Sequence, residues 1–190
     1  IEHERLWLVF QPIASMRGDT NERYEALLRL RGNDGQELVP GSVFGVVYNH
    51  ELGLTLDRWV IEHVLDMLRQ RQRKTTVFIK ILPVTLQDRT LNGWLRERME
   101  QAGVEPQSLV FEVAESTAER SLRDMFSFLG GIKMLGCGFC LDRFGRGTDS
   151  LSLLKNLGAD YVKLDMYFVN GLARDAKKQA QIKELAQSLE

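Results

Sequence analysis

Residues 138–154 read GFCLDRFGRGTDSLSLL, and this stretch indicates the fold class of the chain. Its first residues are apolar on both faces, as in a strand that is covered by helices. The run ends in Asp142 and Arg143, and Gly145 and Gly147 in the following loop permit a tight backbone close to a ligand or metal. A carboxylate at the end of a buried strand often holds a metal ion, so the adjacent guanidinium of Arg143 needs an explanation.

Similar apolar runs occur along the chain, and their order predicts an α/β fold. Six strands are predicted, over Leu6–Ile13, Tyr24–Leu30, Val77–Leu82, Leu109–Val113, Gly138–Asp142 and Tyr161–Asp165. Apolar residues at helical spacing lie at 56–68, 91–99 and 118–129, and we expect these stripes to face the core. Alternating strands and helices favour parallel strands that close into a barrel. The link at 14–23 is too short for a crossover helix, so the first two strands are expected to be antiparallel.

Length and composition fit a globular domain with an ordinary core. The 190 residues suit one domain, or one domain cut short, with 44% apolar and 27% charged residues. A net charge of −1 predicts no general attraction to nucleic acid or anionic lipid, and no apolar run is long enough to span a bilayer. The two cysteines, Cys137 and Cys140, form a Cys-x-x-Cys without a second pair or a nearby histidine. We interpret them as core residues and expect a cytoplasmic location.

Charged residues end five of the predicted strands. They are Glu25, Lys80, Glu112, Asp142 with Arg143, and Lys163 with Asp165. A charge inside an apolar strand costs several kcal/mol unless it is paired or faces water. Functional groups of a parallel barrel gather at the carboxyl ends of its strands, so we expect one polar site there rather than independent surface charges.

Five motifs, in order along the chain, carry a resemblance to a known family. They are FQPI at 10–13, YEALLR at 24–29, FEVAES at 111–116, RFGRG at 143–147 and KLD at 163–165. On these motifs the chain resembles EAL domains, the cyclic di-GMP phosphodiesterase family. The resemblance implies an EAL-type (β/α)8 barrel, similar to a TIM barrel, whose site holds two Mg²⁺ or Mn²⁺ ions and hydrolyses one phosphodiester of cyclic di-GMP. It also implies two further strands beyond Glu190, so we expect residues 1–190 to be a single, C-terminally incomplete domain taken from a longer GGDEF–EAL protein.

The departures from the family pattern fall on the metal ligands. The resemblance implies that Glu25, Glu112 and Asp142 match three family carboxylates. Lys80, however, replaces an asparagine, and Arg143 replaces a second aspartate. A divalent ion about 4 Å from a guanidinium is repelled by roughly 8 kcal/mol at an effective dielectric constant of about 20. We expect both cations to pair with the three carboxylates, and therefore no Mg²⁺ or Mn²⁺ in the site.

Recognition of the nucleotide does not require metal. The expected ligand-binding residues are Gln11, Glu25, Leu28, Arg29, Asp57, Glu112 and Asp142. Arg29 has the planar fork that suits two phosphate oxygens, and Gln11 can donate to and accept from a guanine edge. Asp57 can accept from guanine, but an aspartate near the start of a helix is also a common cap. Leu28 and Phe44 offer apolar surface to a purine, although Phe44 is also a candidate core residue.

The loop at 144–151 has a candidate support of its own. Glu115 resembles the family glutamate that steadies this loop. The alternative is a solvated glutamate in a turn, which would leave the loop without that support.

Three functions remain open. The one we favour is a catalytically inactive EAL domain that binds cyclic di-GMP as a signalling receptor, similar to degenerate EAL domains in type IV pilus control. Its expected partners are a PilZ-type adaptor and an upstream GGDEF domain. The second is an active, metal-dependent phosphodiesterase. The third is a scaffold for protein contact that binds no ligand, against which the retention of Gln11, Glu25, Leu28 and Arg29 argues.

Overall fold

The computed structural model describes residues 5–16, 18–32, 34–38 and 50–188, and all six predicted strands are present. The strands are β1 (Leu6–Pro12), β2 (Glu22–Arg31), β3 (Glu37–Leu38), β4 (Thr75–Lys80), β5 (Leu109–Ala114), β6 (Gly138–Phe144) and β7 (Tyr161–Leu164). The sequence pattern does not predict the short β3, which pairs with the end of β2 at Leu30 and Arg31. This extra strand places Glu37 in register with Arg31, beside the end of β2.

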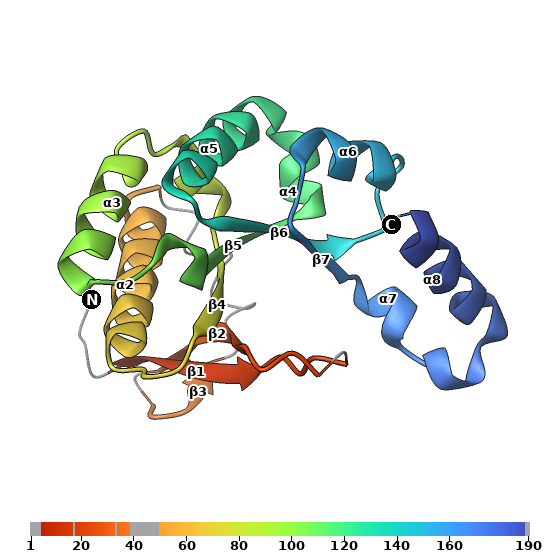
Figure 1. Ribbon diagram of the computed structural model, residues 1–190, viewed down its shortest axis with the longest axis horizontal. Coiled ribbons are helices and arrows are strands. Elements are labelled where there is room, and N and C mark those ends of the chain that lie inside the picture. Colours follow the sequence, from red (N-terminus) through yellow and green to blue (C-terminus); the bar gives the residue numbers. More distant parts are fainter. Residues whose placement is uncertain (1–4, 17, 33, 39–49, 189–190) are drawn as a thin grey trace.

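The strands form one curved sheet in the order β1-β2-β4-β5-β6-β7, with β3 beside β2 (Figure 1). β1 and β2 are antiparallel, because the polar link between them permits only a tight return. The pairs β2–β4, β4–β5, β5–β6 and β6–β7 are parallel. The predicted α/β barrel-type fold with an antiparallel first pair is therefore confirmed.

Helices cover one side of this sheet. The α-helices are α2 (His50–Arg69), α3 (Leu91–Ala102), α4 (Glu115–Arg120), α5 (Leu122–Leu135), α6 (Ser150–Leu157), α7 (Met166–Val169) and α8 (Ala176–Ser188). A short 3-10 helix, η2 (Pro83–Gln87), follows β4. Helices α2, α3, α5 and α6 lie along the convex side of the sheet, whereas α7 and α8 follow the end of β7 (Figure 1). No helix within the described ranges has the length and apolarity to span a membrane.

The helical stripe predicted at 118–129 is two helices rather than one. The backbone leaves the helical region at Ser121, with φ −132° and ψ 45°, which separates α4 from α5. Leu122 and Phe126 are 44% and 50% exposed, so their predicted packing against the core is wrong. Helix α5 begins after this break, and of its residues Met125 is fully buried.

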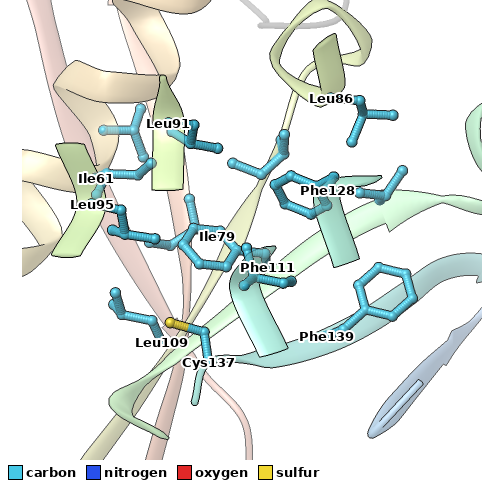
Figure 2. Close-up of a cluster of buried hydrophobic side chains, with 14 of the residues drawn as sticks. Ile61, Ile79, Leu86, Leu91, Leu95, Leu109, Phe111, Phe128, Cys137 and Phe139 are labelled. Atoms are coloured by element: carbon cyan, nitrogen blue, oxygen red, sulfur yellow. The ribbon is translucent and has the colours of Figure 1, made fainter. Parts of the chain in front are cut away.

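Alternation along the strands gives the sheet two different faces. The outer face packs against the helices and forms the main core, which includes Ile79 and Phe111 (Figure 2). The inner face carries a smaller apolar cluster of Phe78, Val110 and Cys140. Successive residues of a strand point to opposite faces, so the charged residues two positions further along these strands share the inner face with this cluster.

Both cysteines are free and buried, as expected for core residues. Burial raises the pKa of the Cys137 thiol to about 12, and it also raises the pKa of Cys140. The Sγ atom of Cys137 lies 4.0 Å from Sδ of Met99, inside the core. A thiol that stays protonated is a poor nucleophile and a poor metal ligand.

Candidate functional site

The strand-end charges lie together on the inner face of the sheet. Lys80 on β4 is in register with Glu112 on β5, and Glu112 is in register with Cys140 on β6. Asp142 follows two residues after Cys140 and so points to the same face. Glu25 lies on the neighbouring strand β2. Parallel register therefore collects these charges at one end of the sheet.

Lys163 on β7 holds two of the carboxylates. Its Nζ atom lies 2.7 Å from Oε2 of Glu25 and 3.0 Å from Oε1 of Glu112. Burial raises the pKa of Glu112 to about 7; Lys163 lowers this pKa, whereas Glu25 raises it. Burial by itself would lower the pKa of Lys163, but Glu112 and Glu25 raise it above its usual value. The lysine therefore stays charged between two acids.

A second ion pair joins Lys80 to Asp142, with 2.8 Å between Nζ and Oδ2. Burial by itself would raise the pKa of Asp142, but Lys80 and Lys163 lower this pKa below its usual value. Asp142 is therefore an ionised acid with an ammonium group against it. The expected pairing of Lys80 with a site carboxylate is confirmed.

The side chain of Arg143 does not take part in this network. Its side chain is exposed, and in the described part of the chain no ion pair joins it to Glu25, Glu112 or Asp142. Side chains alternate along a strand, so the residue after the inward Asp142 leaves on the other side. The pairing of β6 with β7 also shifts register here, and Arg143 adopts a left-handed backbone with φ 54°. The expectation that Arg143 pairs with the site carboxylates is wrong.

The arrangement of these side chains does not fit a divalent metal ion. Mg²⁺ and Mn²⁺ bind where several oxygen ligands converge on one point. Here Asp142 is directed at Lys80, while Glu25 and Glu112 are directed at Lys163. Over the ranges that the structure describes, no three His, Cys, Asp or Glu side chains are grouped closely enough to hold a metal ion. The positive charge among the acids comes from ammonium groups.

A cavity of about 170 Å³ opens beside these ion pairs, between the ends of β2 and β4 and the first half of α2. Its lining includes Glu25, Leu28, Arg29, Asp57 and Lys80. Most of the predicted ligand-binding residues therefore meet here, and Glu112 and Asp142 are linked to the cavity wall by the two lysines. Gln11 is exposed on β1, opposite Glu25. Phe44 lies outside the described residues.

Asp57 lies inside α2, which begins at His50, so its alternative interpretation as a helix cap is wrong. The residue is buried, and its Oδ2 accepts hydrogen bonds from the backbone N–H of Leu82 (2.9 Å) and the hydroxyl of Thr85 (2.5 Å). Burial raises the pKa of Asp57 to about 7, and the two hydrogen bonds lower it only in part. Because both bonds use Oδ2, the other oxygen remains available to a donor in the cavity.

Arg29 is held from two sides at the edge of the cavity. Its Nε lies 3.0 Å from Oε1 of Glu37 on β3, and its Nη1 donates to the carbonyl oxygen of Leu28 at 3.0 Å. A guanidinium carries five N–H donors, so others remain for a phosphate. The sequence pattern does not single out Glu37, because its pairing with Arg29 depends on the unpredicted strand β3.

Glu115 anchors the loop that follows β6. Its Oε2 accepts hydrogen bonds from the backbone N–H groups of Gly145, Arg146 and Gly147, each at 3.1 Å. The glutamate is buried at the start of α4, so its interpretation as a solvated turn residue is wrong. Gly145 has φ 99°, a conformation that suits glycine, which allows the loop to bend back over the carboxylate.

Asp165, another of the predicted strand-end charges, has a local role instead. Its Oδ1 accepts from the backbone N–H of Tyr167 at 2.8 Å and caps the short helix α7. A carboxylate directly before a helix is a common N-cap, and this is the signal that separates Asp165 from the acids of the site.

Comparisons with known proteins agree with the fold and with the family that the sequence motifs indicate. The EAL domain family model matches residues 1–190. The cyclic di-GMP phosphodiesterase PdeF of Escherichia coli (strain K12) is 30% identical over 179 residues, which cover 93% of this chain and 24% of PdeF. The chain thus spans about a quarter of the length of that curated relative.

Two crystal structures share the fold closely. The FimX EAL domain from Pseudomonas aeruginosa bound to c-di-GMP has a TM-score of 0.91 and 32% identity, over 99% of this chain and 76% of that chain. The Xanthomonas citri FimX EAL domain in complex with c-di-GMP has a TM-score of 0.86 and 28% identity, over 96% and 72% of the two chains. With the family match over its whole length, the chain belongs to the EAL domain family.

Proposed function

We propose that this EAL domain binds cyclic di-GMP without divalent ions and does not hydrolyse it, so that it acts as a signalling receptor. The observation that carries the proposal is the 2.8 Å ion pair between Lys80 and Asp142. Lys80 stands where the family pattern has a neutral metal ligand, and it engages an acid of the family's metal site. A charged lysine has no lone pair to offer and repels a cation.

Support for ligand binding comes from the cavity and from the structural relatives. The two FimX EAL domains were both crystallised with c-di-GMP. In this chain, Arg29 has donors left for a phosphate, and Asp57 has a carboxylate oxygen left for the N1–H and amino group of guanine. The proposed ligand-binding set remains Gln11, Glu25, Leu28, Arg29, Asp57, Glu112 and Asp142.

A receptor of this kind needs neighbours that supply and read the signal. We propose an upstream GGDEF domain and a PilZ-type adaptor, in a role similar to that of type IV pilus regulators. These partners follow from the family resemblance. Ligand-dependent co-elution with a purified PilZ-domain protein would test the adaptor, and co-elution that ignores the nucleotide would contradict it.

Two measurements on the purified protein test the receptor function. In the first, cyclic di-GMP is titrated by calorimetry in the presence of EDTA, and we expect micromolar or tighter binding. In the second, the nucleotide is chromatographed after incubation with Mg²⁺ or Mn²⁺, with PdeF as the positive control, and we expect it to be recovered intact. No binding heat in EDTA would contradict the receptor.

The alternative function is an active phosphodiesterase. The 30% identity to PdeF favours it, as does the retention of Glu25, Glu112 and Asp142. The same chromatography decides, because a linear dinucleotide formed only with metal would establish this activity and exclude the proposed receptor-only role.

A further inference from the structure

We infer that Lys80, together with Arg29, binds a phosphodiester group of the nucleotide directly. The inference rests on the proposed function and adds a ligand contact to it. The proposed receptor function requires Lys80 only to keep metal ions out, but its position beside the cavity and its remaining N–H donors suit a second role.

The two cations approach the same space from neighbouring strands. Both line the cavity between β2, β4 and α2. Ile79 is in register with Ala26, which places Lys80 level with Leu27 and two residues short of Arg29 along the parallel strands. With a rise of about 3.3 Å per residue and strands about 4.8 Å apart, their Cα atoms are roughly 8 Å from each other. Two long side chains at this spacing can hold one phosphodiester between them.

The ammonium group of Lys80 has donors to spare. It carries three N–H groups, and the ion pair with Asp142 engages one side of it. The Lys80 side chain is 42% exposed, whereas that of Asp142 is 8% exposed, so the acid lies behind the ammonium group and the cavity lies in front of it. Lys80 can therefore keep its ion pair and bind an anion at the same time.

The other lysine of the site cannot take this role as readily. Lys163 is placed between Glu25 and Glu112, which together carry more negative charge than one ammonium group compensates. A phosphate that enters the cavity would meet these acids without a cation in front of them. Lys80 supplies that cation on the cavity side.

A merely neutralising role for Lys80 is the competing explanation, and paired variants separate the two. Cyclic di-GMP is titrated in EDTA against the wild-type protein and the variants Lys80→Met, Lys80→Arg, Asp142→Asn and Lys80→Met/Asp142→Asn. Lys155→Met, an exposed lysine on α6, controls for the loss of one positive charge. Thermal unfolding of every variant checks the fold, and Lys80→Gln provides a second neutral side chain.

We expect Lys80→Met to weaken binding roughly tenfold to a hundredfold, because one direct charge contact is lost. Lys80→Arg should retain most of the affinity, and Lys155→Met should retain all of it. Removing Lys80 should weaken binding by the same factor in both backgrounds: Lys80→Met against wild type, and the double variant against Asp142→Asn. Binding by Lys80→Met should also fall less steeply with salt.

Two results would overturn the inference while leaving the receptor function intact. One is wild-type affinity in Lys80→Met. The other is full recovery in the double variant, which would assign Lys80 only to the neutralisation of Asp142. If the wild-type protein itself does not bind in EDTA, the proposed function fails and the inference fails with it.

Discussion

The loop after β6 and the centre of the strand-end site both contain buried acids, but their charges are compensated in different ways. In the loop, Glu115 accepts hydrogen bonds from three backbone N–H groups. In the centre, Asp142 faces Lys80, and the acids of β2 and β5 face Lys163. The first acid depends on the main chain, whereas the others depend on side chains.

Backbone hydrogen bonds therefore keep the shape of the loop, whereas side-chain ion pairs set the chemistry at the centre of the site. Backbone donors are present whatever the side chain, so the loop keeps its form as long as Glu115 is there. Side-chain cations can be gained or lost by single substitutions, so the centre can change from one that suits metal to one that repels it.

Replacing Glu115 by alanine should have the largest effect, because three backbone N–H groups lose a buried, charged acceptor. We expect the free energy of unfolding to fall by about 3–5 kcal/mol, as measured by urea denaturation. Glu100→Ala on the exposed side of α3 is the matched control and should change stability by less than about 0.5 kcal/mol. A loss as small as the control's would remove the distinction between the two regions.

Asp57 is a buried acid of a third kind, because its hydrogen bonds come from neutral donors, the backbone N–H of Leu82 and the hydroxyl of Thr85. Its folded-state pKa of about 7 lies above the ordinary 3.8, so through this group the protein binds a proton more tightly when folded and loses stability as the pH rises between these values. Asp57→Asn keeps an acceptor for Leu82 and Thr85 but cannot ionise. At about pH 8 we expect it to be on the order of 2–4 kcal/mol more stable than wild type.

Urea denaturation across the pH range measures this effect. The gain should shrink as the pH falls through the ordinary pKa of 3.8 and become small at about pH 3, where the acid is largely neutral in both states. Glu112 also has a raised pKa, so the wild-type dependence on pH should not vanish completely in Asp57→Asn. A gain that does not vary with pH would show that packing, rather than ionisation, distinguishes the variant.

Replacing Lys80 by the asparagine that the family pattern has there tests whether Lys80 keeps metal out of the site, as proposed above. In Lys80→Asn the ammonium group that pairs with Asp142 is replaced by a neutral side chain with an amide oxygen. If the site then binds Mg²⁺ with a Kd of about 1 mM, about 10 mM Mg²⁺ should stabilise the variant by roughly 1.4 kcal/mol in thermal unfolding. The wild-type protein is the control and should show no such stabilisation. Equal responses of both proteins would contradict our interpretation of Lys80.

The smallest effect is expected at the rim of the cavity, where Glu37 pairs with Arg29. Glu37 is 57% exposed, and pairs of this kind contribute about 0–1 kcal/mol. Glu37→Gln removes a negative charge that competes with phosphate for Arg29, so we expect about two- to fivefold tighter binding of cyclic di-GMP in EDTA. Glu184→Gln on α8 should leave the affinity unchanged. Weaker binding by Glu37→Gln would show that Glu37 positions the guanidinium instead.

The strands and their order were predictable from the sequence for simple physical reasons. Runs that are apolar on both faces form strands covered by helices, and the short link after Ile13 leaves only an antiparallel return. The meeting of Lys80, Glu112 and Asp142 also follows, because carboxyl ends of parallel strands share one edge of the sheet. Glu25 lies in the first half of β2 and joins them through its ion pair with Lys163.

The partners of these acids were not predictable in the same way. Whether Lys163 or Arg143 reaches Glu25 depends on which face of its strand each residue occupies, and the register shift between β6 and β7 is not visible in composition or spacing. Helix α2 begins at His50, before the apolar stripe predicted at 56–68, so Asp57 lies in the helix interior. The position of Glu37 depends on β3, a two-residue strand whose sequence shows no strong strand pattern.

The backbone conformation at Arg143 determines which side chains this position favours. A φ of 54° is unfavourable for most side chains, but aspartate and asparagine tolerate it several-fold more often than arginine does. The main chain at this position therefore still accommodates the smaller acid without rearrangement. Replacing Arg143 by aspartate should therefore relieve conformational strain, so the backbone does not stand in the way of a carboxylate at this position.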